Sequence, residues 1–210
     1  MASIGSSPSG RRSLLAGWGL ASPSAADLID VDADTLAAAV KDLPARGGIA
    51  RGLGRSYGDP AQNAGGHVLR LAPDNEHLVI DDAACTVTVG AGLSIDDLLA
   101  VIVPRGYFVP VTPGTRFVTI GGAISSDIHG KNHHADGSFG DHVTSMRLML
   151  ADTTIVTIGP DKDPDLFWAT VGGMGLTGMI IDATFQLIPI ETSRLSVETR
   201  RIGHLDEIMS

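Results

Sequence analysis

The pattern of apolar residues along the chain predicts short helices mixed with short strands. Two segments carry apolar residues at helical spacing: Asp34 to Ala45, which begins with a capping aspartate, and Ser94 to Val103, whose capping serine precedes Asp96 and Asp97 in the first turn. A third, shorter helix is expected at Asp165 to Val171. Short strands are expected at residues 47–50, 68–71, 78–80 and 86–89, and residues 108–111 are expected to run extended into a Pro-Gly turn.

The second half of the chain reads as antiparallel strands. Val143 to Leu150 and Thr153 to Ile158 flank an Ala-Asp turn, which predicts a hairpin, and Met179 to Ile188 alternates apolar and polar residues. Beyond Pro189 the pattern weakens, with one more strand expected at 195–197 and a helix at 205–209. Because helices alternate with strands first and hairpins dominate later, we expect an α+β fold rather than a doubly wound sheet.

Composition narrows the class of protein. The chain has 210 residues, of which 43% are hydrophobic and 4% aromatic, so the core should be mainly aliphatic. A net charge of −9 argues against a broad nucleic-acid surface. The single cysteine excludes an internal disulfide, and no apolar run approaches the roughly 18 residues of a membrane span.

The N-terminal residues are expected to form an arm. Met1 to Gly10 is rich in serine and glycine, which predicts disorder, and Ser13 to Ala16 is too short for the apolar part of a signal peptide. Trp18 lies between two glycines, and the simplest interpretation is that it anchors this arm to the core.

Two glycine-rich stretches are the candidate functional segments: Arg51 to Asp59 (RGLGRSYGD) and Gly121 to Gly140 (GGAISSDIHGKNHHADGSFG). Neither suits a strand or the interior of a helix, and both suit a backbone that must approach a ligand closely. The first loop has one residue too many for the Rossmann fingerprint, and no helix is expected after it. Gly173 to Gly178 matches G-x-G-x-x-G, but it leaves a helix and enters a strand, which is the reverse of the Rossmann turn.

An anion cradle without a Rossmann helix fits these stretches better. Successive backbone N–H groups of a glycine-rich turn bind phosphate oxygens, and Arg51 and Arg55 could bridge a pyrophosphate. Hydroxyl donors around the second stretch would come from Thr115, Thr119, Ser125 and Ser126. The alternative is that both stretches are only surface turns.

The histidines of the second stretch raise the question of a metal. His129, His133 and His134 lie close in sequence, but Gly130 weakens a helix and Asp136 is the only obvious further ligand. We therefore expect no metal site. Lys131 and Asn132 would by default be solvated.

Four segments carry a resemblance to a known family. Arg51 to Asp59, Pro113 to His134, Gly137 to Val143 and Phe167 to Gly178 closely resemble the PCMH-type, or vanillyl-alcohol-oxidase, FAD-binding family. Within this family, the motif GKNHH resembles the corresponding motif of the enzymes that oxidise the 2'-hydroxyl of decaprenylphosphoryl-β-D-ribose. The resemblance implies an arm at 1–16, a PCMH-type FAD-binding domain of two α/β subdomains at 17–190, and the truncated start of a substrate domain at 191–210.

The resemblance also implies residue roles. FAD would be bound non-covalently, because Arg55 stands where many relatives carry the histidine that bonds to the flavin. The residues that the resemblance places at the cofactor are Arg51, Gly52, Leu53, Gly54, Arg55, Ser56, Tyr57, Gly58, Asp59, Gly114, Thr119, Ile120, Gly121, Gly122, Ser126, Asp127, Ile128, His129 and Ile180. His129, Lys131 and Tyr57 would face the sugar as catalytic residues, with His129 the better acid–base group by its intrinsic pKa.

The implied reaction is the oxidation of a polyprenylphosphoryl ribose to its 2'-keto sugar, the first half of an epimerisation to the arabinose donor for cell-wall arabinan. A reductase of the short-chain dehydrogenase type would be the functional partner. The implied location is the periplasm or the periphery of the inner membrane, with the cytoplasmic face left open. Two other functions stay open: an aldonolactone or alditol-type FAD oxidase, and a catalytically incomplete FAD-binding fragment.

Overall fold

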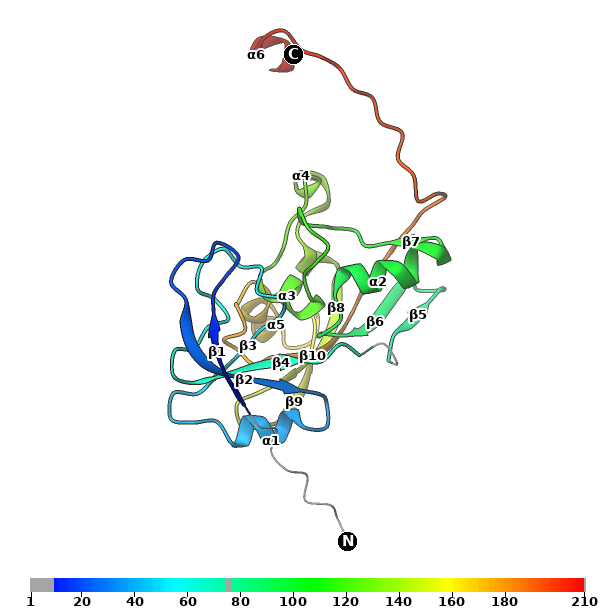
Figure 1. Cartoon of the computed structure of the whole chain (residues 1–210). Helices are drawn as coiled ribbons and strands as arrows, with labels where there is room; N and C mark the ends of the chain where they lie inside the picture. Colours follow the sequence, from blue (N-terminus) through cyan, green and yellow to red (C-terminus); the bar gives the residue numbers. More distant parts are fainter. Residues whose placement is uncertain (1–9, 75–76, 210) are drawn as a thin grey trace.

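The computed structural model describes residues 10–74 and 77–209, and these residues form a four-stranded and a five-stranded sheet that pack side by side (Figure 1). The smaller sheet has the order β1-β2-β4-β3. Its strands are β1 (Arg11–Leu15), β2 (Ser24–Val31), β3 (Gly48–Ala50) and β4 (His67–Leu71). β1 and β2 form an antiparallel hairpin, whereas β2, β4 and β3 run parallel.

The larger sheet is antiparallel throughout and has the order β5-β6-β10-β8-β9. Its strands are β5 (Val79–Asp81), β6 (Thr86–Gly90), β8 (Val143–Met149), β9 (Ile155–Ile158) and β10 (Met179–Gln186). The predicted alternation of β10 is confirmed, since Ala183 and Phe185 are fully buried. A small ladder joins β7 (Tyr107–Phe108) to β11 (Ile188–Pro189).

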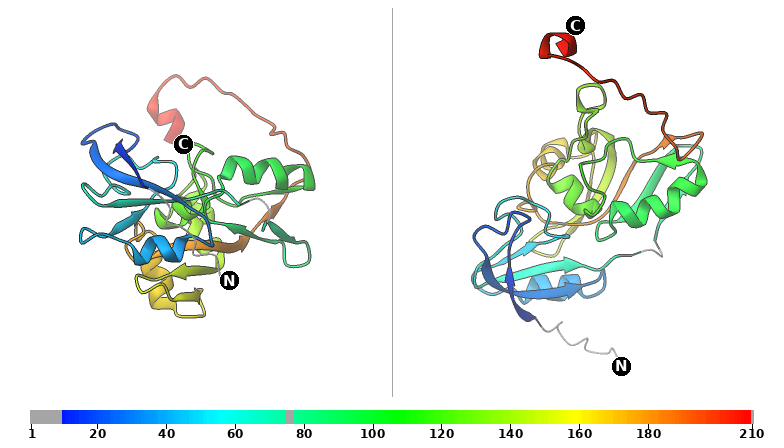
Figure 2. Two further views of the ribbon diagram at one scale, coloured as in Figure 1. Left: turned by 60° about the horizontal axis from the view of Figure 1, so that its bottom comes forward. Right: turned by 45° about the horizontal axis from the view of Figure 1, so that its top comes forward.

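Short helices cover the sheets and build the connections between them (Figure 2). The α-helices are α1 (Leu36–Lys41), α2 (Ile95–Ile102), α3 (Ile120–Ser125), α4 (His133–Asp136), α5 (Pro164–Thr170) and α6 (Leu205–Met209). The described residues also form the 3₁₀ turns η1 (Val103–Arg105) and η2 (Phe139–His142). Ser94 caps α2 as expected, because its hydroxyl oxygen accepts the N–H of Asp97 at 3.1 Å.

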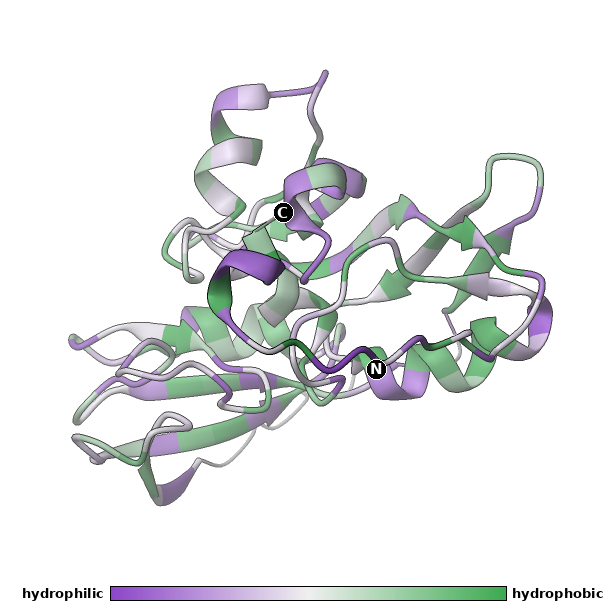
Figure 3. Cartoon of the chain, turned by 90° about the horizontal axis from the view of Figure 1, so that it is seen from above, coloured by the Kyte–Doolittle hydropathy of each residue, from purple (hydrophilic) through white to green (hydrophobic). Residues whose placement is uncertain are grey.

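The two sheets share part of their hydrophobic core. Ile29 and Leu69 of the smaller sheet pack in one cluster with Met149, Met179 and Ile181 of the larger one. Hydrophobic residues concentrate in the strands and helices of the body (Figure 3). This contact fixes the two halves of the α+β fold against each other and so fixes the loops that lie between them.

Several expectations need correction. The arm expected at 1–16 is wrong for Arg11–Leu15, which form β1, while residues 1–9 lie outside the described part. The first helix is shorter than predicted, and the carboxylate that anchors it belongs to Asp32, whose Oδ1 accepts the N–H groups of Asp34 and Thr35. The strand expected at 195–197 is absent from the described residues, which run there as exposed chain leading away from the sheets to α6 (Figure 1).

Candidate functional site

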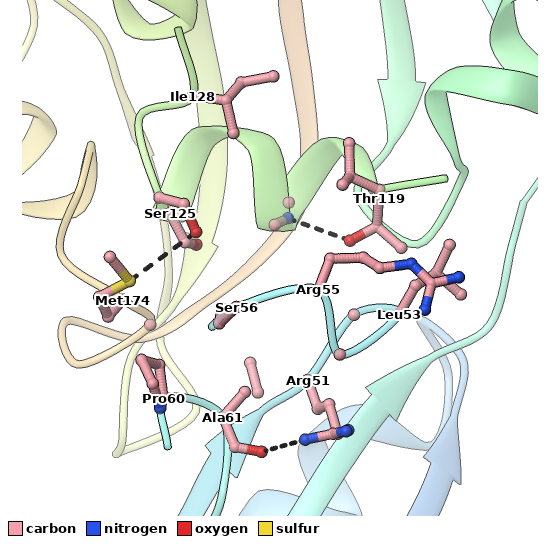
Figure 4. A pocket seen from close by; sticks show the side chains of 18 of the residues that line it. Arg51, Leu53, Arg55, Ser56, Pro60, Ala61, Thr119, Ser125, Ile128 and Met174 are labelled. Atoms are coloured by element: carbon pink, nitrogen blue, oxygen red, sulfur yellow. Dashed lines mark hydrogen bonds between the residues drawn. The ribbon is translucent and has the colours of Figure 1, made fainter. Parts of the chain in front are cut away.

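A cleft of about 750 Å³ lies between the two sheets, and both glycine-rich stretches line it. The first stretch follows β3, and the second forms α3 and the turn after it (Figure 4). They meet at Gly52, where a Cβ atom would lie 2.4 Å from Oγ1 of Thr119. Only glycine allows the loops to come this close, so the shape of the cleft depends on that residue.

The first loop has unpaired backbone donors, and its residues 52–57 line the cleft. Within the part of the chain that the structure describes, no backbone N–H of residues 52–57 donates a hydrogen bond to the protein. Gly54 has φ +68°, a left-handed conformation that glycine adopts without strain. Because backbone N–H groups in a glycine-rich turn bind phosphate oxygens, this loop has the properties of an anion cradle.

The second stretch differs from the first, because the backbone N–H groups at its start already have partners within the protein. The prediction that these groups form part of an anion cradle is therefore wrong. The N–H of Ile120 donates to the carbonyl of Leu93, that of Gly121 to Ala91, and that of Gly122 to Oγ1 of Thr119 at 3.1 Å. These donors are occupied because the segment pairs with the chain that precedes α2. The second stretch therefore supplies a wall with little side-chain bulk, while the first supplies free donors.

Arg51 links the first loop to two neighbouring segments of the chain by hydrogen bonds. Its two terminal nitrogens donate to the carbonyl of Ala16 at 2.7 Å and to that of Ala61 at 3.0 Å (Figure 4). Burial lowers the pKa of its guanidinium, and the nearby charge of Arg70 lowers it further, although an arginine stays protonated. A bound anion would offset this loss of solvation, so the positive charge fits a phosphate nearby.

Arg55 lies at the rim of the cleft. Its Nε donates to the carbonyl of Phe117 at 3.2 Å, and its Cζ lies 4.9 Å from the ring centroid of Trp18. Neither contact uses the terminal nitrogens of Arg55. Within the described residues these nitrogens have no other partner, so they are able to bind an anion.

Most of the predicted cofactor residues line the cleft. The lining includes Arg51, Gly52, Leu53, Gly54, Arg55, Ser56, Tyr57, Gly114, Thr119, Gly121, Gly122, Ser126, Ile128, His129 and Ile180. Two predicted residues turn away: Ile120 is fully buried in the core, and the carboxylate of Asp127 accepts the N–H of Gly140 at 3.0 Å. Gly58, Asp59 and Lys131 also lie outside the lining residues.

The histidine segment lies at the edge of the cleft. His129 is exposed and lines it, whereas His133 and His134 belong to α4 beyond it. The rings of His129 and His133 meet edge to face, with centroids 5.3 Å apart. The carboxylate of Asp136 accepts a hydrogen bond from Asn132 at 2.8 Å, and among the described residues no group of three or more potential ligands could hold a metal ion.

Sequence reasoning missed several residues of the cleft. Trp18 and Phe117 line it from the rim, and Met174 and Gly175 line it from the turn between α5 and β10. The signal in the sequence for this part of the lining is the glycine-rich turn at Gly173 to Gly178. The structure confirms that this turn leaves a helix and enters a strand.

The residues of the cleft fit a dinucleotide bound through its phosphates. A row of free amides, a half-buried arginine and a wall without bulky side chains match a pyrophosphate, and the volume is within the usual range for a ligand site. None of the helices that the structure describes is long and apolar enough to cross a membrane.

Comparison with known proteins gives a consistent result. The FAD binding domain family matches residues 30–159, which include both glycine-rich stretches. The chain is 48% identical over 93% of its length to decaprenylphosphoryl-beta-D-ribose oxidase of Mycolicibacterium smegmatis, covering 44% of that protein. It is 29% identical to L-gulonolactone oxidase of Mus musculus over 67% of the chain and 33% of the relative. The D-arabinono-1,4-lactone oxidase of Yarrowia lipolytica is 30% identical over 50% of the chain and 20% of the relative. The chain thus spans less than half the length of each of these relatives.

Proposed function

Since the chain belongs to the FAD-binding domain family, we propose that it is the FAD-binding part of an oxidase that acts on the 2'-hydroxyl of a polyprenylphosphoryl ribose. The observation that carries the cofactor assignment is the row of free amides at residues 52–57, facing a cleft that glycines keep open. Support for the substrate comes from the 48% identity to the mycobacterial oxidase over 93% of the chain.

The chain's residues have separable tasks in this proposal. The first loop holds the pyrophosphate through backbone donors, and the charges of Arg51 and Arg55 compensate the phosphate charge. When bound, FAD supplies the ring that accepts a hydride from the sugar C–H bond. His129, at the edge of the cleft, takes the proton of the 2'-hydroxyl, since an imidazole exchanges protons near neutral pH. Tyr57 is 81% exposed on the same rim, where it can orient the sugar.

The further parts of the pathway are proposals of the same kind. A 2'-keto sugar needs a reduction to become the arabinose epimer, which a reductase of the short-chain dehydrogenase type would perform. We place the work at the membrane periphery, because the substrate carries a polyprenyl chain.

Absorbance spectroscopy tests the proposal in two steps. The purified chain should retain added FAD through gel filtration, and farnesylphosphoryl ribose should bleach the flavin absorbance under anaerobic conditions. His129→Gln should keep the FAD and slow bleaching by about 10²–10⁴-fold, the usual contribution of a general acid–base group. Loss of the flavin on the column would contradict the cofactor site. Retained FAD that the sugar does not bleach would favour a binding domain without turnover, and bleaching by L-gulonolactone instead would favour an aldonolactone oxidase.

A further inference from the structure

The histidine loop, residues 129–138, projects from the body of the molecule. In Figure 1, α4 lies at the outer end of this loop. The two ends of the loop meet at its base, where the N–H of Phe139 donates to the carbonyl of Ile128 at 2.8 Å and His129 forms a β-bridge with Ser138. The base fixes where the loop leaves the body, but the residues beyond the base need a further support.

Asn132 provides that support through its side-chain amide. The amide nitrogen donates to the carbonyl of Pro110 at 3.0 Å and to the carboxylate of Asp136 at 2.8 Å, so both of its N–H groups are engaged. Pro110 is buried in the segment between β7 and α3, whereas Asp136 belongs to α4. One amide therefore ties the histidine loop both to the body and to the outer end of the loop. The expectation that Asn132 is solvated is wrong, because the residue is half-buried.

The oxygen of the same side chain lies against Gly130. A Cβ atom on Gly130 would overlap Oδ1 of Asn132 and would lie 2.8 Å from the carbonyl oxygen of Thr112, so the backbone passes tightly between these two groups. Gly130 is buried, although its neighbours His129 and Lys131 are exposed. The position of Gly130, and with it the backbone of His129, therefore depends on Asn132.

His133 connects this arrangement to the ring of His129. Nδ1 of His133 lies 3.1 Å from the carbonyl oxygen of Gly130, and because a carbonyl only accepts, Nδ1 is the nitrogen that carries the proton. The ring of His133 meets that of His129 edge to face, with centroids 5.3 Å apart. The imidazole of His129 thus has a neighbour that is held by the same backbone that Asn132 supports.

We propose that Asn132 is a positioning residue for His129, which it holds at the edge of the cleft through Gly130 and His133. Asn132 lies outside the residues that line the cleft, so it acts on the site without touching a ligand. The consequence for the reaction rests on the function proposed above, in which His129 takes the proton of the sugar 2'-hydroxyl. Proton transfer needs the two heavy atoms within about 3 Å of each other, so an imidazole that is not held in place transfers the proton more slowly.

Asn63 offers a matched control in another part of the chain. Its amide also donates to two carbonyls, those of Arg46 at 3.1 Å and Gly47 at 3.0 Å, and it also packs against a glycine, since a Cβ on Gly66 would overlap it. Asn63 precedes β4 and lies outside the cleft lining. Asn63→Ala therefore removes the same kind of support from a loop that does not carry His129.

The first measurement follows the histidine rings by NMR and needs neither flavin nor turnover. The full chain is labelled with ¹³C-histidine, and the signals of His129 and His133 are identified by their loss in His129→Gln and His133→Gln. The unmodified chain and Asn63→Ala should show a nuclear Overhauser contact between the two rings, whose centroids lie 5.3 Å apart. Asn132→Ala should lose this contact, and its melting curve should show that it is still folded.

The second measurement is the anaerobic bleaching of bound FAD by farnesylphosphoryl ribose. Asn132→Ala should bind FAD as the unmodified chain does but bleach it about 10²-fold more slowly, a usual cost of a small misplacement of a reacting group. Asn63→Ala should bleach at the rate of the unmodified chain. Asn132→Asp keeps the size of the side chain but has no N–H to donate, and its carboxylate would face that of Asp136, so it should behave like Asn132→Ala.

Other results would overturn the proposal. An unchanged ring contact and bleaching rate in Asn132→Ala would show that Asn132 does not position His129, and full recovery in Asn132→Asp would show that its side chain only fills space. Equal losses in Asn63→Ala and Asn132→Ala would assign the effect to general destabilisation. If the unmodified chain binds no FAD or does not bleach it, the proposed function fails, and the ring contact in Asn132→Ala still decides whether Asn132 positions His129.

Discussion

Arg51 and Gly52 are neighbours with different tasks in the first loop. The guanidinium of Arg51 is engaged by the carbonyls of Ala16 and Ala61, so the side chain joins the β1–β2 hairpin to the loop and brings its charge under the cleft. Gly52 acts through the absence of a side chain, since its Cα faces the hydroxyl of Thr119. The charge and the open space that an anion needs therefore come from adjacent positions.

Replacing Gly52 tests the close approach of the two stretches. In Gly52→Ala the new Cβ would lie 2.4 Å from Oγ1 of Thr119, whose hydroxyl accepts the N–H of Gly122. Either the loop or the start of α3 must shift, and we expect a loss of about 1–3 kcal/mol, the usual cost of overpacking. Chemical denaturation measures the stability, and flavin titration should show weaker FAD binding.

Gly58→Ala provides the matched control in the same loop. The nearest atom to a Cβ there is Cδ of Pro60 at 3.6 Å, an ordinary van der Waals contact. This variant should unfold and bind FAD as the unmodified chain does. Equal behaviour of the two variants would show that the approach at Gly52 has no special role.

At the scale of elements, the turn before α1 is held by hydrogen bonds to one carboxylate, that of Asp32. Oδ1 of Asp32 accepts the N–H of Thr35 at 2.8 Å, that of Asp34 at 3.1 Å and the hydroxyl of Thr35 at 2.6 Å. The helix that follows is only six residues long and buries Leu36 and Ala39 against the smaller sheet. A helix this short depends on its anchor and its packing rather than on intrinsic propensity.

Removing that anchor should destabilise the chain. Asp32→Ala leaves the N–H groups of Asp34 and Thr35 without their acceptor, and we expect a loss of about 1 kcal/mol in the free energy of unfolding. Asp32→Asn keeps an oxygen acceptor and should lose less. Urea denaturation followed by circular dichroism measures both variants, and equal stability of Asp32→Ala and the unmodified chain would exclude an anchoring role.

The whole molecule consists of two sheets with a cleft between their loops, and carboxylates of both parts have a lowered pKa: Asp30 and Asp32 at the smaller sheet and Asp152 in the turn between β8 and β9. Asp30 and Arg70 face each other on parallel strands β2 and β4 and form a two-point ion pair at 2.6 and 2.9 Å. The hydrogen bond from Arg70 holds the pKa of Asp30 below its usual value, and the bonds from Thr35 do the same for the pKa of Asp32.

These shifts predict the direction of the pH dependence. A carboxylate whose pKa is lower in the folded state contributes stability above its unfolded pKa of about 4, and this contribution is lost as the pH falls through the folded pKa. We expect these carboxylates to contribute equally to the free energy of unfolding from pH 7 to about 5, and their contribution to decline below about 4. The exposed Asp30–Arg70 pair should account for no more than about 1 kcal/mol of it.

Asp30→Asn makes that contribution measurable. The variant should be slightly less stable than the unmodified chain at pH 7, and its stability should fall less between pH 5 and pH 2.5. Urea denaturation at each pH gives both curves. Parallel curves for the two proteins would show that this ion pair does not contribute to acid unfolding.

The sequence by itself determined the elements whose information is local. The apolar periods of β8, β9 and β10, the serine cap of α2 and the α+β class depend on neighbouring residues and on the burial of one face, so they could be predicted. The glycine-rich stretches also carried their own signal, because a chain needs glycine where its backbone approaches another group closely.

Tertiary structure decided which groups of those stretches are free to bind. The amides of the second stretch are occupied because Thr119 and its neighbours pair with residues 91–94, whereas the amides of the first stretch have no such partner. Periodicity cannot reveal a contact between segments so distant in the sequence. The same holds for Trp18, which reaches the cleft only because β1 and β2 form a hairpin against the first loop. Local patterns set the elements, whereas the donors and surfaces of the site depend on long-range packing.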